Sequence, residues 1–420
     1  MMTRTNNARL AIGDPSFAGL WINDPVHQEY LRQDVQRQLD FFRPTLRADG
    51  GYNVPDMAGD PLTDGPQEIH LTTRMVHSFA LAKQFGYADC DDVIDAGMAY
   101  ILNVHHDSRY GGYMAAINRD GTPADDTKLA YGHSFVLLAA ATAKDAGHPD
   151  ADRLLADITE VLQTRYWEES YGRFAEEFRA DWTPFSKYRG LNANMHSVEA
   201  HLAAFEATND ASYLDRAGRI LSFFFEELAP AHGWRLPEHF TEDWTVDADY
   251  EGNPMFRPAG STPGHSFELG RLLLQYWDLT GRADESSPAK ARRIIEQALS
   301  DGAMPDGGFA YTLRNGKIAV RDRYWWPVTE AIGALAVLLK LNPTAADETL
   351  YRAQWDFSDT HLIDHVRGGW YHELDDDGQP VSRQFLGKPD IYHSIQAGLF
   401  PPVPALSRLT MSASSAARKQ

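Results

Sequence analysis

The stretch Pro263-Gly264-His265-Ser266-Phe267 recurs, with variations, along the whole chain. The related strings are Met75-Val76-His77-Ser78-Phe79, Tyr131-Gly132-His133-Ser134-Phe135, Asn194-Met195-His196-Ser197-Val198 and Ile391-Tyr392-His393-Ser394-Ile395. A diverged copy, Trp325-Trp326-Pro327-Val328-Thr329-Glu330, precedes the last of them. A spacing of about 60 residues between copies is typical of a fold built from repeated supersecondary units.

A second string, made of glycines and aromatic residues, alternates with the first. Its copies are Gly50-Gly51-Tyr52, Gly111-Gly112-Tyr113, Tyr171-Gly172-Arg173-Phe174, Gly233-Trp234, Gly307-Gly308-Phe309 and Gly368-Gly369-Trp370. Several copies are followed by a tight-turn pair such as Asp120-Gly121, Asn315-Gly316 or Asp377-Gly378. Glycine pairs, aromatic residues and such turns predict short β-hairpins or extended loops.

Two helical patterns follow each His-Ser string. The first is apolar on most sides, as in 135–143, 198–207, 267–274 and 331–339, which predicts a buried helix. The second is amphipathic, as in 150–164, 211–225 and 287–299. We therefore expect an all-α fold in which six helical hairpins form an (α/α)6 barrel, with short β-hairpins or loops at one mouth.

A closed ring is favoured over an open helical solenoid, because the last unit is as apolar as the middle ones and no polar cap is evident. Residues 1–406 are expected to form this single catalytic domain. The Ser- and Ala-rich segment 407–420 is expected to be a disordered tail.

Composition excludes several classes of function. The chain of 420 residues has a formal net charge of −20, which opposes binding to nucleic acid or to an anionic membrane. The single cysteine, Cys90, rules out an intramolecular disulfide and a cysteine-based metal cluster. The most apolar run, 331–339, is too short to span a bilayer, and residues 1–20 lack the apolar core of a secretory signal. We expect a cytoplasmic enzyme.

Equivalent units would place each His-Ser string at the same height, near the N-terminus of an inner helix. Helix N-termini present free N–H groups and lower the pKa of a nearby imidazole, so neutral histidines would surround one mouth. We expect His77 and His133 to be structural. The polar and aromatic candidates around the mouth are Arg74, Tyr131, Phe135, Asn192, Glu199, Glu268, Trp326 and Glu330.

Three chemistries compete for such a site. The pairs His196/Glu199 and His265/Glu268 have a spacing that suits a dinuclear metal centre. Glycoside hydrolysis would need two carboxyl groups on either side of the scissile bond, whereas the repeated residue here is histidine. Proton transfer next to a carbonyl needs only two imidazoles and a donor that stabilises the enediolate oxygen. The third chemistry is favoured, and a non-catalytic carbohydrate-binding ring remains a fourth interpretation.

In these segments the sequence resembles the N-acylglucosamine 2-epimerase superfamily, and within it the branch of aldose–ketose isomerases. The segments that carry the resemblance are 70–77, 188–200, 237–240, 256–258, 264–268, 326–331 and 387–393. The similarity extends from about Phe41 to Pro402.

The resemblance implies metal-independent interconversion of D-mannose and D-fructose, or of D-lyxose and D-xylulose, through a cis-enediol. It implies His265 and His393 as the acid/base pair with Arg74 polarising oxygen, no cofactor and no metal site. Residues implied to contact the sugar or line its pocket are His70, Tyr131, Phe135, Asn192, His196, Glu199, Arg257, Glu268, Trp326 and Glu330.

The alternatives are a sugar 2-epimerase acting on mannose and glucose, and a sulfoquinovose isomerase. A glycoside hydrolase is less favoured. The expected partner is a monosaccharide, with no nucleic acid or membrane, and the expected assembly is a monomer or homodimer.

Overall fold

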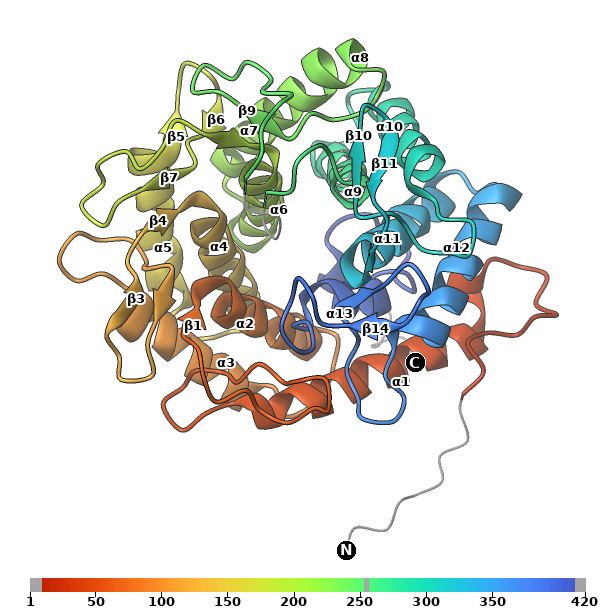
Figure 1. The fold of residues 1–420 in the computed structure, drawn as a ribbon, viewed down its shortest axis with the longest axis horizontal. Helices are drawn as coiled ribbons and strands as arrows, with labels where there is room; N and C mark the ends of the chain where they lie inside the picture. The colour runs from red at the N-terminus through yellow and green to blue at the C-terminus, as the bar shows by residue number, and fades with distance from the viewer. Residues whose placement is uncertain (1–9, 253–256, 412–420) are drawn as a thin grey trace, which may run out of the picture.

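The computed structural model describes residues 10–252 and 257–411, and most of them are helical. Six helices of this described part form an inner ring (Figure 1). They are α2 (Ile69–Gln84), α4 (Ala130–Asp145), α6 (Leu191–Thr208), α9 (Pro263–Leu279), α11 (Trp325–Leu341) and α13 (Tyr392–Leu399). Each helix packs on the next and α13 packs on α2, so the ring closes.

An outer layer of helices surrounds this ring. It consists of α1 (Pro25–Phe42), α3 (Asp91–Tyr100), α5 (Ala151–Val161), α7 (Ala211–Ser222), α10 (Ser287–Gly302) and α12 (Ala345–Phe357). Four of these helices run on into π-helical turns: η3 (Ile101–His105), η4 (Leu162–Tyr166), η5 (Phe223–Leu228) and η6 (Ser358–Leu362). Short helical segments complete the described chain: η1 (Trp21–Asn23), η2 (Arg43–Thr45) and α8 (Ala229–Ala231). None of the described helices combines the length and apolar character that crossing a membrane requires.

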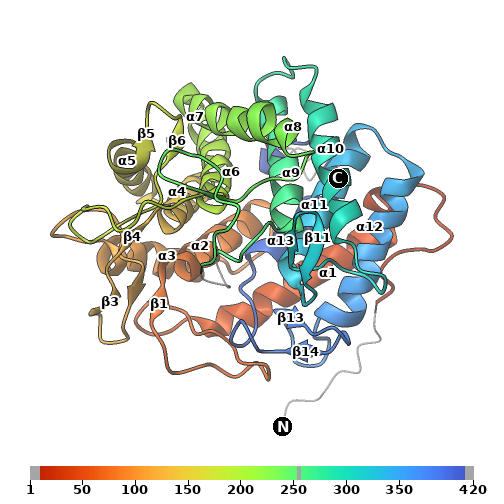
Figure 2. The same cartoon turned by 45° about the horizontal axis from the view of Figure 1, so that its top comes forward.

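Short antiparallel strands lie between the helices, and several of them are labelled in Figure 2. The strands are β1 (Gln67–Glu68), β2 (Ala116–Ile117), β3 (Pro123–Asp125), β4 (Lys128–Leu129), β5 (Trp167–Glu168), β6 (Arg173–Phe174), β7 (Glu177–Phe178), β8 (Arg189–Gly190), β9 (His239–Phe240), β10 (Thr312–Arg314), β11 (Lys317–Val320), β12 (Arg323–Tyr324), β13 (Glu373–Leu374) and β14 (Pro380–Val381). They pair as β1-β2-β3, β4-β7, β5-β6, β8-β9, β10-β11 and β12-β13-β14. Four of these pairings, β1-β2, β4-β7, β8-β9 and β12-β13, join the strand before an inner helix to the strand after the following outer helix.

Backbone carbonyls from these hairpins bind the start of four inner helices. The first N–H of α2, α4, α6 and α11 is bonded to the carbonyl of Ala115, Glu176, Glu238 and His372, respectively. The residues that precede these helices make no side-chain capping hydrogen bond. Because a free helix N-terminus leaves N–H groups unsatisfied, these carbonyls take the place of side-chain caps and fix the starts of these four inner helices.

Ion pairs with buried cations hold the hairpins to the ring. Lys128 bonds Asp107 (2.8 Å), Arg189 bonds Glu168 (2.6 Å) and Arg323 bonds Asp306 (2.5 Å), which is itself exposed. Each of these cations lies two residues before an inner helix. Lys388, shortly before α13, bonds the buried Asp364 in the same way (2.7 Å). These repeated contacts give each buried cation a carboxylate partner.

The N-terminal helix α1 supplies the outer partner of α13, a pairing that the sequence repeat does not reveal. It packs along α13 although the two helices lie at opposite ends of the chain (Figure 1). The hydroxyl of Ser394 donates to Gln38 Oε1 (2.5 Å), and Val35 lies against the backbone of Gly398. The chain therefore closes the ring by returning its first helix to its last.

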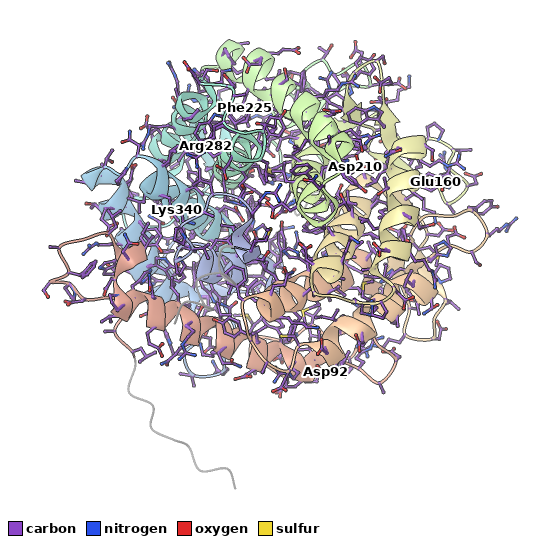
Figure 3. The ribbon with its side chains drawn as sticks, turned by 180° about the vertical axis from the view of Figure 1, so that it is seen from behind. Asp92, Glu160, Asp210, Phe225, Arg282 and Lys340 are labelled. Carbon is purple, nitrogen blue, oxygen red and sulfur yellow. The ribbon has the colours of Figure 1, made fainter. Side chains whose placement is uncertain are left out.

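The C-terminal segment is ordered beyond the predicted boundary at 406. The hydroxyl of Ser407 donates to Asp278 (2.5 Å), the N–H of Arg408 donates to Glu206 (3.0 Å), and Leu409 is buried. Lys340, labelled in Figure 3, donates to the carbonyls of Phe400 and Ala405 (2.7 and 3.2 Å). Residues 407–409 thus contact the helices of the ring beyond the predicted boundary. The remainder of the predicted tail, 412–420, lies outside the described residues.

The predicted equal height of the histidines is wrong in part. His265 and His393 lie in the first turn of their helices, whereas His196 lies in the second turn of α6 and His77 in the third turn of α2. His133, expected to be structural, uses both ring nitrogens within the fold. Nδ1 bonds the carbonyl of Leu129 (2.8 Å) and Nε2 accepts the N–H of Tyr113 (3.1 Å).

Stability should depend on pH through His133. Burial, with the nearby charge of Lys128, lowers the pKa of His133 from 6.5 to about 3, because a charged imidazole is poorly solvated in the interior. The unfolded chain binds this proton below pH 6.5 and the folded chain does not, so stability falls as the pH drops from 6.5 towards 3. In His133→Gln this contribution, about 1.4 kcal/mol per pH unit, should disappear. Urea unfolding across this range measures it, and an unchanged pH slope would contradict it.

Leu39→Ala should test closure of the ring by α1. Leu39 is fully buried on α1, so its truncation should lower the free energy of unfolding by about 2–5 kcal/mol. The exposed Arg32→Ala on the same helix is the control and should change it by less than about 0.5 kcal/mol. Calorimetry should show one cooperative transition in both variants. A separate early transition in Leu39→Ala would mean that α1 is not an integral part of the ring.

Candidate active site

A cavity of about 340 Å³ lies at the mouth formed by the starts of the inner helices. Residues from the first unit to the last line it, so it exists only once the ring has closed. The predicted residues that line it are His70, Arg74, Tyr131, Asn192, His196, His265, Glu268, Trp326 and His393.

Four predicted residues do not line this cavity. Phe135, Glu199 and Glu330 are buried behind side chains that do. Arg257 instead bonds Glu177 (2.8 Å) and Glu176 (3.4 Å) and lies over the ring of Tyr188. Its neighbours 253–256 lie outside the described residues.

The two histidines proposed as the acid/base pair pack against one indole. The ring centroid of His265 lies 5.0 Å from that of Trp326, and the centroid of His393 lies 5.9 Å from the same indole. Both imidazoles are nearly buried and line the cavity. Residues from the fourth and sixth units therefore meet at one pocket, as proton transfer between adjacent carbons requires.

His393 is oriented by a buried carboxylate. Its Nδ1 lies 2.7 Å from Glu330 Oε1, and the other oxygen of Glu330 accepts from Arg271 (3.1 Å). Burial lowers the pKa of His393, and the bond to Glu330 opposes this effect only in part. The expected lowering is thus present, but burial is its largest cause. With Nδ1 held by Glu330, the imidazole is neutral at pH 7 and Nε2 is its available base.

His265 is held by a residue that the sequence analysis did not select. Its Nδ1 lies 2.9 Å from Glu238 Oε2 and 2.8 Å from the hydroxyl of Thr262. Burial alone would raise the pKa of Glu238, but His265, His239 and the hydrogen bond from Thr262 bring it below its usual value. Its place in the repeat could have identified it, since Glu238 lies just before the short strand that follows a glycine–aromatic string.

Arg74 is fixed in place at the cavity wall. Its guanidinium bonds Asp390 (3.1 Å) and the hydroxyl of Tyr131 (2.7 Å), and it lies over the rings of Phe135 and Tyr392. Burial alone would lower the pKa of Arg74, but Tyr131 and Asp390 bring it above its usual value. Asp390 and Tyr392 were not selected from the sequence although they flank the predicted His393.

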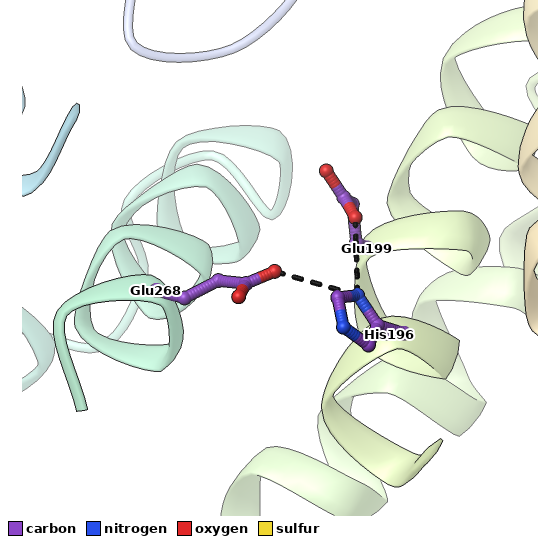
Figure 4. Close-up of side chains that lie close together, drawn as sticks. All are labelled: His196, Glu199 and Glu268. Atoms are coloured by element: carbon purple, nitrogen blue, oxygen red, sulfur yellow. Dashed lines mark ion pairs between the residues drawn. The ribbon is translucent and has the colours of Figure 1, made fainter. Parts of the chain in front are cut away.

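A buried group of His196, Glu199 and Glu268 lies deeper in the site (Figure 4). The Nδ1 of His196 is 3.6 Å from Glu199 and 3.5 Å from Glu268, which reaches it from a different helix. Glu199 accepts a hydrogen bond from the hydroxyl of Tyr392. Burial, with the nearby charges of Glu330 and Glu199, raises the pKa of Glu268 well above its usual value, which favours the protonated form of this carboxyl.

The four residues predicted for a dinuclear metal centre are arranged differently in the structure. Of its four residues, His196, Glu199 and Glu268 come together, but His265 turns to Glu238. A second group, Glu268 with Glu330 and His393, shares Glu268 with the first. Arg271, also missed in the sequence, already brings a positive charge to this place by bonding Glu330.

Two loops cover the outer side of the cavity. Residues 52–55 and 62–66 come from the first unit, and residues 385–388 come from the last. The N–H of Lys388 donates to the carbonyl of Pro55 (2.8 Å), and Gly387 lies against the same carbonyl with a φ of +69°. A side chain on residue 387 would collide with Pro55, so glycine allows the two loops to meet. Tyr311, Trp325 and His372 complete the wall and were also not selected.

Comparison with known proteins places this architecture and site in a family. The sequence profile described as N-acylglucosamine 2-epimerase (GlcNAc 2-epimerase) matches residues 50–397. The chain belongs to the N-acylglucosamine 2-epimerase family. The match contains the residues His70 to His393 that line the cavity and the hairpins that position them.

Relatives in this N-acylglucosamine 2-epimerase family are similar over nearly their whole length. A D-mannose isomerase from Thermobifida fusca is 39% identical, over 92% of this chain and 96% of the relative. A D-mannose isomerase from Pseudomonas cannabina pv. alisalensis is 38% identical, over 91% and 94%. A crystal structure of a D-mannose isomerase superposes with a TM-score of 0.83 at 29% identity, covering 92% of this chain and 98% of the other.

The neutral state of Glu268 can be measured directly in this family member. Infrared difference spectroscopy near pH 7 should show the carbonyl stretch of a buried carboxylic acid in the wild type, because ionising Glu268 beside Glu199 and Glu330 is unfavourable. The contribution of Glu268 to this band should be missing in Glu268→Gln. Exposed Glu29→Gln is the control and should keep it. An identical spectrum in Glu268→Gln would show that the carboxyl is ionised.

Proposed function

We propose that this chain is a metal-independent aldose–ketose isomerase that interconverts D-mannose and D-fructose. The observation that carries the proposal is that two imidazoles, each held at Nδ1 by its own buried glutamate, face one cavity beside a common indole. The relatives of Thermobifida fusca and Pseudomonas cannabina support the choice of sugar. The two rings of helices support classing the fold as an (α/α)6 barrel of six helical hairpins.

His393 is assigned as the base that moves the proton between C2 and C1. Glu330 holds Nδ1, and burial favours the uncharged ring, so Nε2 can take the C2 proton of the open-chain aldose. The electron pair of the C–H bond then forms the C1–C2 double bond, and the former carbonyl oxygen becomes an enediolate. The proton on O2 then passes to O1, and return of the proton from His393 to C1, as the C2=O2 double bond forms, gives the ketose.

His265 is assigned to ring opening and closing. Opening a pyranose needs a proton on the ring oxygen and removal of one from the anomeric hydroxyl. With Nδ1 engaged, Nε2 of His265 is the nitrogen available for this exchange, and Trp326 between the two imidazoles offers an apolar face to the sugar ring.

Arg74 and Glu268 are assigned to the oxygens of the intermediate. Arg74 is held rigidly by Asp390 and Tyr131, so its charge can stabilise the enediolate without reorganisation. A neutral Glu268 can donate a hydrogen bond where an ionised carboxylate would repel the developing negative charge. Asn192, His196 and His70 line the same wall and are assigned to sugar hydroxyls.

Glycoside hydrolysis fits these contacts less well. It needs two carboxyl groups free to act on opposite sides of the bond. Glu238 and Glu330 are each bonded to an imidazole, and Glu199 is bonded to Tyr392. The histidines rather than a carboxyl pair therefore face the reacting atoms.

Incubation of the protein with single sugars in D₂O tests the reaction. Mannose should give fructose that carries solvent deuterium at C1, because the imidazole proton exchanges with solvent during the enediol step. If glucose were the main product from mannose, the protein would be a 2-epimerase. If sulfoquinovose but not mannose were converted, it would be a sulfonated-sugar isomerase. Lyxose should give xylulose. Fructose without deuterium would contradict proton transfer by His393.

The two histidine variants should separate catalysis from folding. His393→Asn and His265→Asn should each lower kcat by about 10²–10⁴-fold, since each removes a proton-transfer group. KM should change little, and both variants should remain folded at the assay temperature although each loses a nearly buried ring bonded to a glutamate. Thr159→Val, far from the cavity, is the control. Near-wild-type kcat in either histidine variant would refute its assignment.

The pH profile should reflect the lowered pKa of His393. A lower pKa leaves more of the ring unprotonated at a given pH, so kcat/KM should hold its value at pH 6.5 and decline only in more acidic solution. Rates measured from pH 4 to 9 with mannose check this. An acid limb with its midpoint above pH 6.5 would contradict a buried neutral base.

EDTA treatment should leave activity unchanged, because Arg271 already supplies positive charge beside Glu330 and the assigned chemistry uses no metal. Assay after dialysis against EDTA, with and without Mn²⁺, Co²⁺ or Zn²⁺, measures this. Loss of activity that one of these ions restores would favour the metal interpretation of His196, Glu199 and Glu268.

A further inference from the structure

We propose that Glu238 is a positioning residue that fixes the tautomer and orientation of His265. The inference rests on the proposed function, because it concerns how one of the two assigned acid/base groups is prepared for its reaction.

Glu238 ties together the starts of two inner helices. Its backbone carbonyl accepts the first N–H of α6 (2.9 Å). One oxygen of its buried carboxylate accepts both the N–H and the hydroxyl of Thr262, which precedes α9. The other oxygen bonds Nδ1 of His265 (2.9 Å). A single side chain thereby connects the backbone at the start of α9 to the imidazole in its first turn.

The hydrogen-bond pattern decides which nitrogen of His265 carries the proton. The hydroxyl of Thr262 has one hydrogen, and it is donated to Glu238 at 2.7 Å. Towards His265, 2.8 Å away, this hydroxyl can therefore act only as an acceptor. The carboxylate is also an acceptor. Both neighbours of Nδ1 thus require an N–H there, and a neutral His265 keeps its lone pair on Nε2.

Comparison with the other units argues against a purely structural role. The positions whose carbonyls bind the starts of α2, α4 and α11 are Ala115, Glu176 and His372. Ala115 shows that an inner helix can start correctly with no carboxylate at this position. Glu176 turns towards Arg257 instead. A carboxylate that bonds a cavity imidazole at this position is found, in the described chain, only at Glu238.

The two glutamate–histidine pairs also differ in their second contacts. Glu330 shares its charge with Arg271. The second oxygen of Glu238 meets the neutral N–H and hydroxyl of Thr262. Glu238 can therefore stabilise a positive charge on His265 when the ring holds a proton during ring opening.

Glu238→Gln is the most direct test. The amide oxygen can still accept from Thr262, but the NH₂ group then faces Nδ1 and favours the tautomer with hydrogen on Nε2. We expect kcat with mannose to fall by about 10²–10⁴-fold while KM stays within about threefold. ¹⁵N spectra of histidine-labelled protein, with His265 assigned from His265→Asn, should show the protonated nitrogen change from Nδ1 to Nε2.

Glu168→Gln is the matched control. Glu168 is a carboxylate of a neighbouring hairpin that bonds Arg189 before α6, and it does not line the cavity. We expect this variant to keep kcat within about twofold and to leave the His265 spectrum unchanged. Thermal unfolding of both variants measures any loss of helix capping.

Each outcome bears on the proposal. Wild-type kcat in Glu238→Gln, or an unchanged His265 tautomer, would overturn it, and a lowered unfolding midpoint with normal kcat would assign Glu238 a capping role only. If the wild type does not convert mannose, the proposed function fails. The ¹⁵N experiment then still decides whether Glu238 sets the tautomer.

Discussion

Closure of the inner ring is the constraint on which the other features depend. The short helix α13 must pack on α2, and α1 must return from the far end of the chain to cover α13. Without these contacts, His393 and Arg74, which belong to the last and first units, would not share a cavity. The loops that meet at Pro55 and Lys388 cross the same junction, so the cover of the site depends on closure as well.

The histidines show how one repeated string acquires different roles. His133 uses both ring nitrogens on the backbone and is fully committed to the fold. His265 and His393 each use only Nδ1, on a glutamate, and present the other nitrogen to the cavity. The histidines differ in their hydrogen-bond partners and not in the repeated string around them, because the neighbouring hairpin or helix of each unit contributes a different residue. The repeat sets the position of each histidine, and its neighbours set its hydrogen bonds.

Electrostatic balance keeps this polar interior stable. Glu199, Glu268 and Glu330 lie around Arg271, with Arg74 and Asp390 paired nearby. Three ionised carboxylates in so small a volume would repel one another strongly, and the raised pKa of Glu268 lowers this repulsion by favouring its protonated form. The neutral donor and the uncharged His393 of the proposed chemistry therefore depend on the same arrangement of charges as the stability of this interior.

The amino-acid sequence by itself determined the repeat, the predominance of helix and the main candidates in the cavity, including His265, His393, Arg74 and Trp326. These follow from local patterns, since helical periodicity and the phase of a repeated string require no knowledge of distant contacts. Only the tertiary structure decided that α1 closes the ring, that Arg257 turns away to Glu177, and that Glu238 and Arg271 support the histidines and carboxylates. A hydrogen bond between residues of different units depends on how the helices pack against one another, and that packing is not encoded in either segment alone.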